Sequence, residues 1–216
     1  MRSLDVPGHE PAVVSVPVPR PRAFPLLIAA HGAGDTPEWQ CEVWNQIAGE
    51  RAVILCPRGV AIVRGGDSGY FYRNHLELEK EVVAATRALK DALGGSVDVE
   101  RAVYTGYSQG ATMGALMIRT HADQFPRLVL VEGGHGEWTL RVARAFHQHG
   151  GERVLFVCGG TGCAERARKS AQLLERAGVV ARSELVPRGG HTYGGAVAER
   201  LAQIFDWVTQ GDERWR

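Results

Sequence analysis

The sequence predicts an α/β fold in which a mostly parallel central sheet is covered by helices on both faces. Short continuous apolar runs alternate with longer helical patterns, and such runs are typical of strands buried on both faces. The length of 216 residues fits one large domain better than two small ones. With 44% hydrophobic and 23% charged residues, the chain has the composition of a globular protein with a sizeable core.

Each element follows from this pattern in order along the chain. A proline-rich connector at 17–25 precedes the first apolar run, so residues 1–23 are expected to form an extended segment or an edge strand. Strands are expected at 24–31, 52–57, 101–106, 127–133, 153–159 and 182–187. Helices are expected at 38–50, 74–93, after Ser108, and at 164–177 and 195–210. Ligands of such sheets bind at the carboxyl ends of the strands, so chemistry is expected just after each apolar run.

Charge and hydropathy exclude several classes of partner. A net charge of +1 without any block of Lys or Arg does not favour nucleic acid. No apolar run reaches the roughly 20 residues that a membrane-spanning helix needs. The first 22 residues have no continuous apolar core, so they do not form a signal peptide as they stand.

The stretch GYSQG, residues 106–110, matches the G-x-S-x-G nucleophile elbow, with an expected strand before it and an expected helix after it. A serine in such a sharp turn needs neighbours without side chains, because the strand and the helix would otherwise collide. Ser108 would then lie at a helix N-terminus, where the partial positive charge favours a developing anion. The alternative is a chance match, since the chain holds 27 glycines.

A serine nucleophile needs a base, and with this elbow the chain order is serine, acid, histidine. Of eight histidines, His191 alone lies beyond Ser108 at the end of a late expected strand, in GGHTYGG. His135 follows another strand and is ambiguous. The remaining histidines lie on expected helices or before the elbow.

The stretch HGAGD, residues 31–35, follows the first strong strand and can supply an oxyanion hole. Glycines allow the backbone to approach a substrate closely. We expect the N–H groups of Ala33 and Gln109 to be the donors.

With HGAGD, GYSQGA and GGH in this order, the chain resembles the α/β-hydrolase superfamily. It is most similar to the small carboxylesterase, phospholipase and acyl-protein thioesterase branch, or to dienelactone-hydrolase-like enzymes. The resemblance implies one catalytic domain at 24–216, no large lid domain, serine hydrolase chemistry through an acyl-enzyme on Ser108, and neither a cofactor nor a metal.

The chain departs from this family at the acid. The resemblance places an Asp in the loop after the strand at 153–159, where this chain has Cys163. A thiol cannot stabilise an imidazolium as a carboxylate does. Glu132 is the leading substitute, because it ends an apolar strand and a charge there is costly without a partner. Glu165 is the second choice.

Four cysteines allow three pairings. The expected elements bring Cys41 near Cys56 and Cys158 near Cys163, and two disulfides would imply an exported or periplasmic protein whose leader has been removed. Four reduced cysteines in a cytoplasmic enzyme remain the alternative.

The long loop at 58–75 follows a strand and is expected to overhang the site. Its aromatic residues, with Trp138, can form a wall for an acyl or aryl group; the loop residues are Tyr70, Phe71 and Tyr72. Packing of the loop onto the protein is the competing interpretation.

The sequence therefore predicts an esterase that acts on a small-molecule ester or thioester. Two alternatives remain open: a hydrolase that cleaves amides or peptides, and a protein of this fold that binds a ligand without turnover. The substrate and the oligomeric state do not follow from the sequence.

Overall fold

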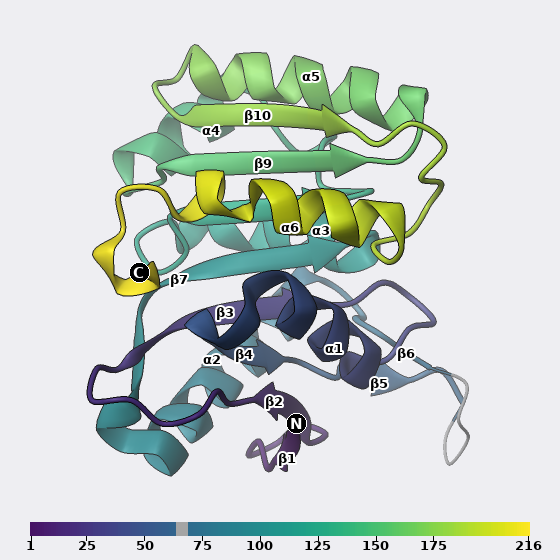
Figure 1. The fold of residues 1–216 in the computed structure, drawn as a ribbon. Helices are drawn as coiled ribbons and strands as arrows, with labels where there is room; N and C mark the ends of the chain where they lie inside the picture. Colours follow the sequence, from purple (N-terminus) through teal and green to yellow (C-terminus); the bar gives the residue numbers. More distant parts are fainter. Residues whose placement is uncertain (64–68) are drawn as a thin grey trace.

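The computed structural model describes residues 1–63 and 69–216 and contains one large sheet. In the described residues this sheet has eight strands in the order β1-β2-β4-β3-β7-β8-β9-β10. Six of these strands, β4, β3, β7, β8, β9 and β10, are parallel. At one edge β2 pairs antiparallel with β4, and β1 pairs antiparallel with β2. Figure 1 shows this arrangement, with the N-terminus beside the edge strands. The prediction of a mostly parallel sheet is confirmed.

The strands and helices are close to the expected ones, with a short hairpin as an addition in the loop after the second expected strand. The strands are β1 (Arg2–Leu4), β2 (Ala12–Ser15), β3 (Phe24–Ala30), β4 (Val53–Cys56), β5 (Val60–Ala61), β6 (Tyr70–Phe71), β7 (Val97–Tyr107), β8 (Arg127–Val131), β9 (Arg153–Cys158) and β10 (Val180–Leu185). The helices are α1 (Pro37–Ala48), α2 (His75–Leu93), α3 (Gln109–Met117), α4 (Leu140–Gln148), α5 (Thr161–Glu175) and α6 (Ala196–Thr209). Strands β5 and β6 form a separate antiparallel hairpin.

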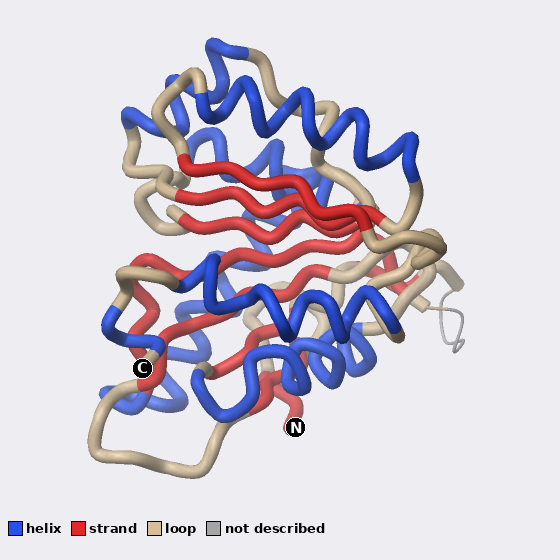
Figure 2. The backbone as a smooth tube through the Cα atoms, turned by 45° about the horizontal axis from the view of Figure 1, so that its top comes forward, coloured by secondary structure: helices blue, strands red, loops and turns tan. Residues whose placement is uncertain are grey.

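Helices cover both faces of the sheet, as Figures 1 and 2 show. Helices α1 and α6 pack on one face through a core that includes Trp44 and Phe205. Helices α2, α3, α4 and α5 pack on the other face, where the core includes Tyr104 and Phe146. Strands β3, β4 and β8 are buried along their whole length because both faces are covered, which explains their continuous apolar sequences. The predicted α/β fold class is confirmed.

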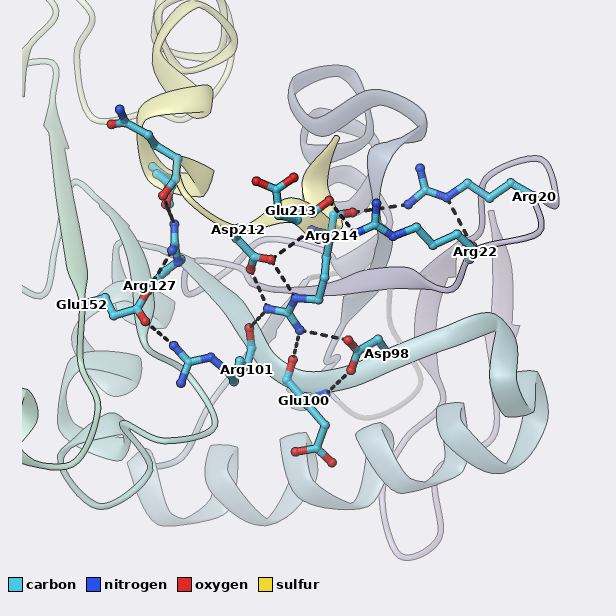
Figure 3. A network of polar contacts seen from close by, with 12 residues as sticks. Arg20, Arg22, Asp98, Glu100, Arg101, Arg127, Glu152, Asp212, Glu213 and Arg214 are labelled. Carbon is cyan, nitrogen blue, oxygen red and sulfur yellow. Dashed lines mark hydrogen bonds and ion pairs between the residues drawn. The ribbon is translucent and has the colours of Figure 1, made fainter.

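The C-terminal turn is tied to the start of β7 by the guanidinium group of Arg214 (Figure 3). This group donates hydrogen bonds to the carboxylates of Asp98 (3.1 Å) and Asp212 (2.6 and 2.8 Å) and to the carbonyl oxygens of Glu100 and Arg101. Burial opposes ionisation of Asp212, but its hydrogen bonds to Arg214 outweigh burial and lower the pKa of the Asp212 carboxyl group. The network closes the end of the sheet away from the strand carboxyl ends.

Helices in the described part of the chain are too short or too polar to cross a membrane.

Candidate active site

Ser108 lies at the sharp turn between β7 and α3 with a backbone φ of 48° and ψ of −105°. Positive φ is unfavourable for a residue with a side chain, and such strain is concentrated at functional sites. The flanking glycines make the turn possible. A Cβ on Gly106 would lie 2.6 Å from Ala111 N, and a Cβ on Gly110 would lie 2.3 Å from the carbonyl oxygen of Ala30. The sequence requirement for small neighbours therefore has a steric cause in this structure.

The hydroxyl of Ser108 does not cap the helix that it begins. The unusual backbone turns the hydroxyl away from α3, and Ser108 Oγ lies 2.9 Å from His191 Nε2. Serine is ordinarily a favourable N-cap residue. Three α-helices in the described part of the chain do begin with a side-chain cap, from Thr36, Asn74 and Thr139. No side chain therefore caps α3; the N–H of Gly110 donates instead to the carbonyl oxygen of His31 at 3.1 Å, and the N–H of Gln109 is left beside the serine.

His191 joins Ser108 to a carboxylate. It lies in the loop between β10 and α6, and its Nδ1 is 3.1 Å from Glu132 Oε2. Glu132 directly follows β8 with φ of 54°, and its side chain is 7% exposed, whereas the His191 side chain is 59% exposed. The Tyr107 hydroxyl donates a hydrogen bond of 2.7 Å to the carbonyl oxygen of His191. The structure thus brings serine, histidine and glutamate into one hydrogen-bonded line.

The structure distinguishes between the two candidate acids. Glu132 reaches His191, whereas Glu165 is exposed on α5. Cys163, at the position where the family resemblance places an Asp, forms a disulfide with Cys158, and the predicted pairing of Cys41 with Cys56 is also present.

The loop at 31–35 lies against the elbow. A Cβ on Gly32 would be 2.8 Å from the ring of Tyr107 and 3.3 Å from Ser108 Cβ. The N–H groups of Gly34 and Asp35 are used within the loop and its hairpin contact. The N–H groups of Ala33 and Gln109, which the sequence proposes as oxyanion donors, have no acceptor among the described residues.

His31 braces this loop from below. Its ring is fully buried and stacks on Tyr72 at 4.7 Å, and its two nitrogens face the carbonyl oxygens of Gly32 (2.7 Å) and Arg58 (2.8 Å). Burial lowers the pKa of His31 below its usual value, and the contacts with the two carbonyl oxygens oppose this shift. His31 therefore supports the backbone of the loop.

Two of the four aromatic residues expected to contact substrate are buried. Tyr72 is 2% exposed and donates to the carbonyl oxygen of Pro57, and Trp138 is 5% exposed and donates to the carbonyl oxygen of Gly134. We therefore assign Tyr72 and Trp138 to packing of the core. Phe71 lines a cavity beside β5 and α2.

Tyr70 lies next to the loop at 31–35, where its N–H donates to the carbonyl oxygen of Asp35 and its carbonyl oxygen accepts from the N–H of Gly34. Residues 64–68 of the expected overhanging loop lie outside the described residues.

A second group of aromatic residues lies beside the site, and the sequence analysis did not predict it. The rings of Tyr107 and Tyr193 are 4.6 Å apart, and the half-exposed Trp39 lies 6.5 Å beyond Tyr193. The Tyr193 hydroxyl donates a hydrogen bond of 2.6 Å to Asp35 Oδ2. This bond links the loop that carries His191, here called the histidine loop, to the loop at 31–35. The available signal was position, since Tyr107 lies inside the elbow motif and Tyr193 is two residues after His191.

Within residues 1–63 and 69–216, one group of side chains has spacing suited to a metal ion, namely Glu132, Cys158 and Cys163, whose ligand atoms lie within 4.8 Å of one another. The two sulfur atoms are bonded to each other, so neither is a thiolate that can bind a metal.

The chain has the α/β-hydrolase fold. Solved structures with this fold include the Bacillus cereus carboxylesterase, with a TM-score of 0.62 and 18% identity over 91% of this chain and 93% of that one. Another is the Pyrococcus horikoshii acylaminoacyl peptidase, with a TM-score of 0.67 and 15% identity over 97% of this chain and 40% of that one.

The chain spans 59% of the length of a matched uncharacterized protein from Bacillus cereus and 58% of a matched thermostable esterase. The corresponding TM-scores are 0.68 and 0.62, at identities of 14% and 16%. No protein-family model matches the sequence, and comparison with curated protein sequences finds no match. The likeness therefore lies in the fold.

Proposed function

We propose that the protein is a serine hydrolase that cleaves carboxylic esters or thioesters. The observation that carries the proposal is the line of contacts from Glu132 through His191 to Ser108, at 3.1 and 2.9 Å. These distances are those of a base that can take the serine proton and of an acid that can orient the base. The positive φ of Ser108 and its uncapped helix add independent support.

Each group has a distinct part in this mechanism. His191 Nε2 removes the proton of Ser108 as Oγ attacks the carbonyl carbon, and Glu132 stabilises the imidazolium. The N–H groups of Ala33 and Gln109 donate hydrogen bonds to the oxyanion. His191 then gives its proton to the leaving oxygen or sulfur, which leaves an acyl-enzyme. Water, deprotonated by His191, attacks this ester and releases the acid and free Ser108.

The exposure of the site favours small or extended substrates. His191 is more than half exposed, and Ala33 is also at the surface. A bulky lipid gains little in an open site because few apolar contacts surround it. The partly exposed ring of Tyr107, 5.3 Å from that of His191, offers one apolar side next to the serine, and the buried ring of Tyr193 supports it at 4.6 Å. We therefore expect activity toward short acyl or aryl esters.

Hydrolysis of p-nitrophenyl acetate, butyrate and octanoate by the wild type and Ser108→Ala tests the proposal. We expect turnover by the wild type, and a decrease of at least a thousandfold in the variant. A fluorophosphonate probe should label the wild type and leave Ser108→Ala unlabelled. A folded wild-type protein that neither reacts with the probe nor hydrolyses any ester would refute the proposal and favour ligand binding without turnover.

Amide cleavage is the second candidate, because the acylaminoacyl peptidase shares this fold. An amine is a poorer leaving group than an alcohol or a thiol, so the same groups must protonate it more completely. Comparison of p-nitroanilides with p-nitrophenyl esters of the same acid separates the two activities. A kcat/KM for the anilide equal to that for the ester would favour the peptidase.

A further inference from the structure

Gly159 contacts Glu132 and Gly190, the residue before His191. Its N–H donates a hydrogen bond to Glu132 Oε1, the carboxylate oxygen that does not face His191. Its carbonyl oxygen accepts a hydrogen bond of 3.3 Å from the N–H of Gly190, the residue before His191. One residue therefore holds the carboxylate and the histidine loop in register.

The contact between Gly159 and the histidine loop leaves no room for a side chain. A Cβ on Gly159 would lie 2.1 Å from the carbonyl oxygen of Gly190 and 2.5 Å from its nitrogen. The next residue, Gly160, has nothing within 4 Å of a Cβ and has an extended backbone. The two neighbouring glycines thus form a natural pair of test and control positions.

A disulfide closes the short segment that contains Gly159. Cys158 ends β9 and precedes Gly159, and Cys163 lies in the first turn of α5, five residues away. The sulfur atoms and a carboxylate oxygen of Glu132 lie within 4.8 Å of one another. The disulfide therefore restrains the segment at the point where it touches the acid.

We propose that the Cys158–Cys163 disulfide is a positioning element of the active site, acting through Gly159, and that its reduction lowers turnover. The inference rests on the proposed hydrolase function. The Glu132 side chain has rotatable bonds, and the N–H of Gly159 fixes the rotamer in which Oε2 faces His191. Opening the disulfide frees the segment 159–162, so this N–H is no longer held on the carboxylate.

A dithiol reagent supplies the chemistry. One of its thiolates attacks a sulfur of the Cys158–Cys163 bond, which breaks the bond and forms a mixed disulfide. Its second thiolate displaces the protein sulfur. The reagent becomes a cyclic disulfide after giving up two electrons, and the two cysteines each gain one proton as thiols.

Access favours this disulfide over the other one. Residues 160–162 of its loop are exposed, and Cys163 is 8% exposed. Cys41 and Cys56 are both 0% exposed. The dithiol is therefore expected to reduce Cys158–Cys163 first, because thiol exchange requires contact with a sulfur atom.

The first test compares Gly159→Ala with Gly160→Ala. We expect kcat for p-nitrophenyl acetate to fall at least tenfold in Gly159→Ala with KM within twofold, and to stay within twofold of wild type in Gly160→Ala. Circular dichroism and thermal melts establish that each variant is folded. Equal kcat in the two folded variants would contradict the role of Gly159.

The second test uses Cys41→Ala/Cys56→Ala, which keeps only the proposed disulfide. Treatment with dithiothreitol should lower kcat at least fivefold as two thiols become alkylatable, and reoxidation should restore it. Cys158→Ala/Cys163→Ala should show the low kcat and no response to the reagent. Unchanged kcat after both thiols have been alkylated would overturn the proposal.

A proton resonance separates this inference from the proposed function. The proton between His191 Nδ1 and Glu132 gives a low-field signal, assigned by its loss in Glu132→Ala. The signal should weaken on reduction whether or not an ester is turned over. Lack of hydrolysis with a redox-sensitive signal would refute only the proposed function, and hydrolysis with an insensitive signal would refute only the inference.

Discussion

Replacement of Glu132 by glutamine should lower kcat about 100-fold without unfolding the protein. The substitution keeps the shape of the side chain and removes the negative charge that faces His191. At the observed 3.1 Å, a full charge pair is worth about 5 kcal/mol at an effective dielectric constant near 20, and about 1.3 kcal/mol in bulk water. Glu132 is nearly buried and His191 is mostly exposed, so an intermediate value of about 3 kcal/mol applies, which corresponds to about two powers of ten in rate.

The assay is steady-state hydrolysis of p-nitrophenyl acetate, with kcat and KM determined separately. KM should change little, because the imidazolium exists only during the reaction. Glu165→Gln is the matched control, since Glu165 is exposed on α5, and it should retain wild-type kcat. A Glu132→Gln protein with kcat within threefold of wild type, or a large loss in Glu165→Gln, would refute the assignment of the acid.

Three further predictions concern the supports of the site and the C-terminal turn. Gly110→Ala should destabilise the protein by about 1–3 kcal/mol and reduce activity, because its Cβ would meet backbone oxygen at 2.3 Å; thermal denaturation measures this. Tyr193→Phe should lower kcat about threefold to tenfold with KM nearly constant, because it removes one neutral-to-charged hydrogen bond between two loops. Arg214→Ala should destabilise the fold by about 2–4 kcal/mol and leave kcat unchanged, as urea unfolding and ester hydrolysis will report.

The Arg214 variant also has a pH signature. The folded pKa of Asp212 lies below its unfolded value of about 3.9, so this carboxylate stabilises the fold above that pH and the contribution is lost as pH falls toward the folded pKa. Urea unfolding of the wild type should lose this increment below about pH 4, and Arg214→Ala should lack it. If the free energy of unfolding depended on pH in the same way in both proteins, the stabilising role of the ionised Asp212 would be contradicted.

Gly136→Ala is a control for Gly110→Ala, because a Cβ on Gly136 has nothing within 4 Å. Its melting temperature should remain close to that of the wild type. A loss of stability equal to that of Gly110→Ala would show that steric contact with the backbone is not the cause. For Tyr193→Phe, a change in KM alone would indicate a substrate contact in place of loop alignment.

The parts of the fold that the sequence predicts are those buried on both faces. Strand β3 is buried at all seven positions, so its apolar run has no polar interruption. The helix expected at His147 and His149 had no predicted bounds, because α4 has nine residues and buries two of them, Ala143 and Phe146. Strand β1 lies at the edge of the sheet and is mostly exposed, whereas β2 is buried but has only four residues, and its pairing with β4 depends on residues far along the chain.

The candidate site was predictable where one segment carries its own geometry. GYSQG places Ser108 through local sterics, and Glu132 is marked by its charge at the end of an apolar strand. The substrate aromatics were not predictable in this way. Tyr72 is buried because its hydroxyl donates to the Pro57 carbonyl oxygen and its ring stacks on His31. These contacts join segments that are far apart in the sequence. Tyr193 and Trp39 meet from opposite ends of the chain for the same reason.

Ser108 and Glu132 lie just beyond the neighbouring strands β7 and β8, so the sheet fixes the distance between them. Tyr107 pairs with Val131 in these strands, and the residue after each of them has a positive φ. Backbone hydrogen bonds between the strands therefore set the separation of nucleophile and acid. His191 alone arrives on a loop. Heat should therefore disturb the histidine before it disturbs the other two. On heating, activity should be lost at a lower temperature than the one at which the sheet unfolds, because the His191 imidazole leaves its position between Ser108 and Glu132 first.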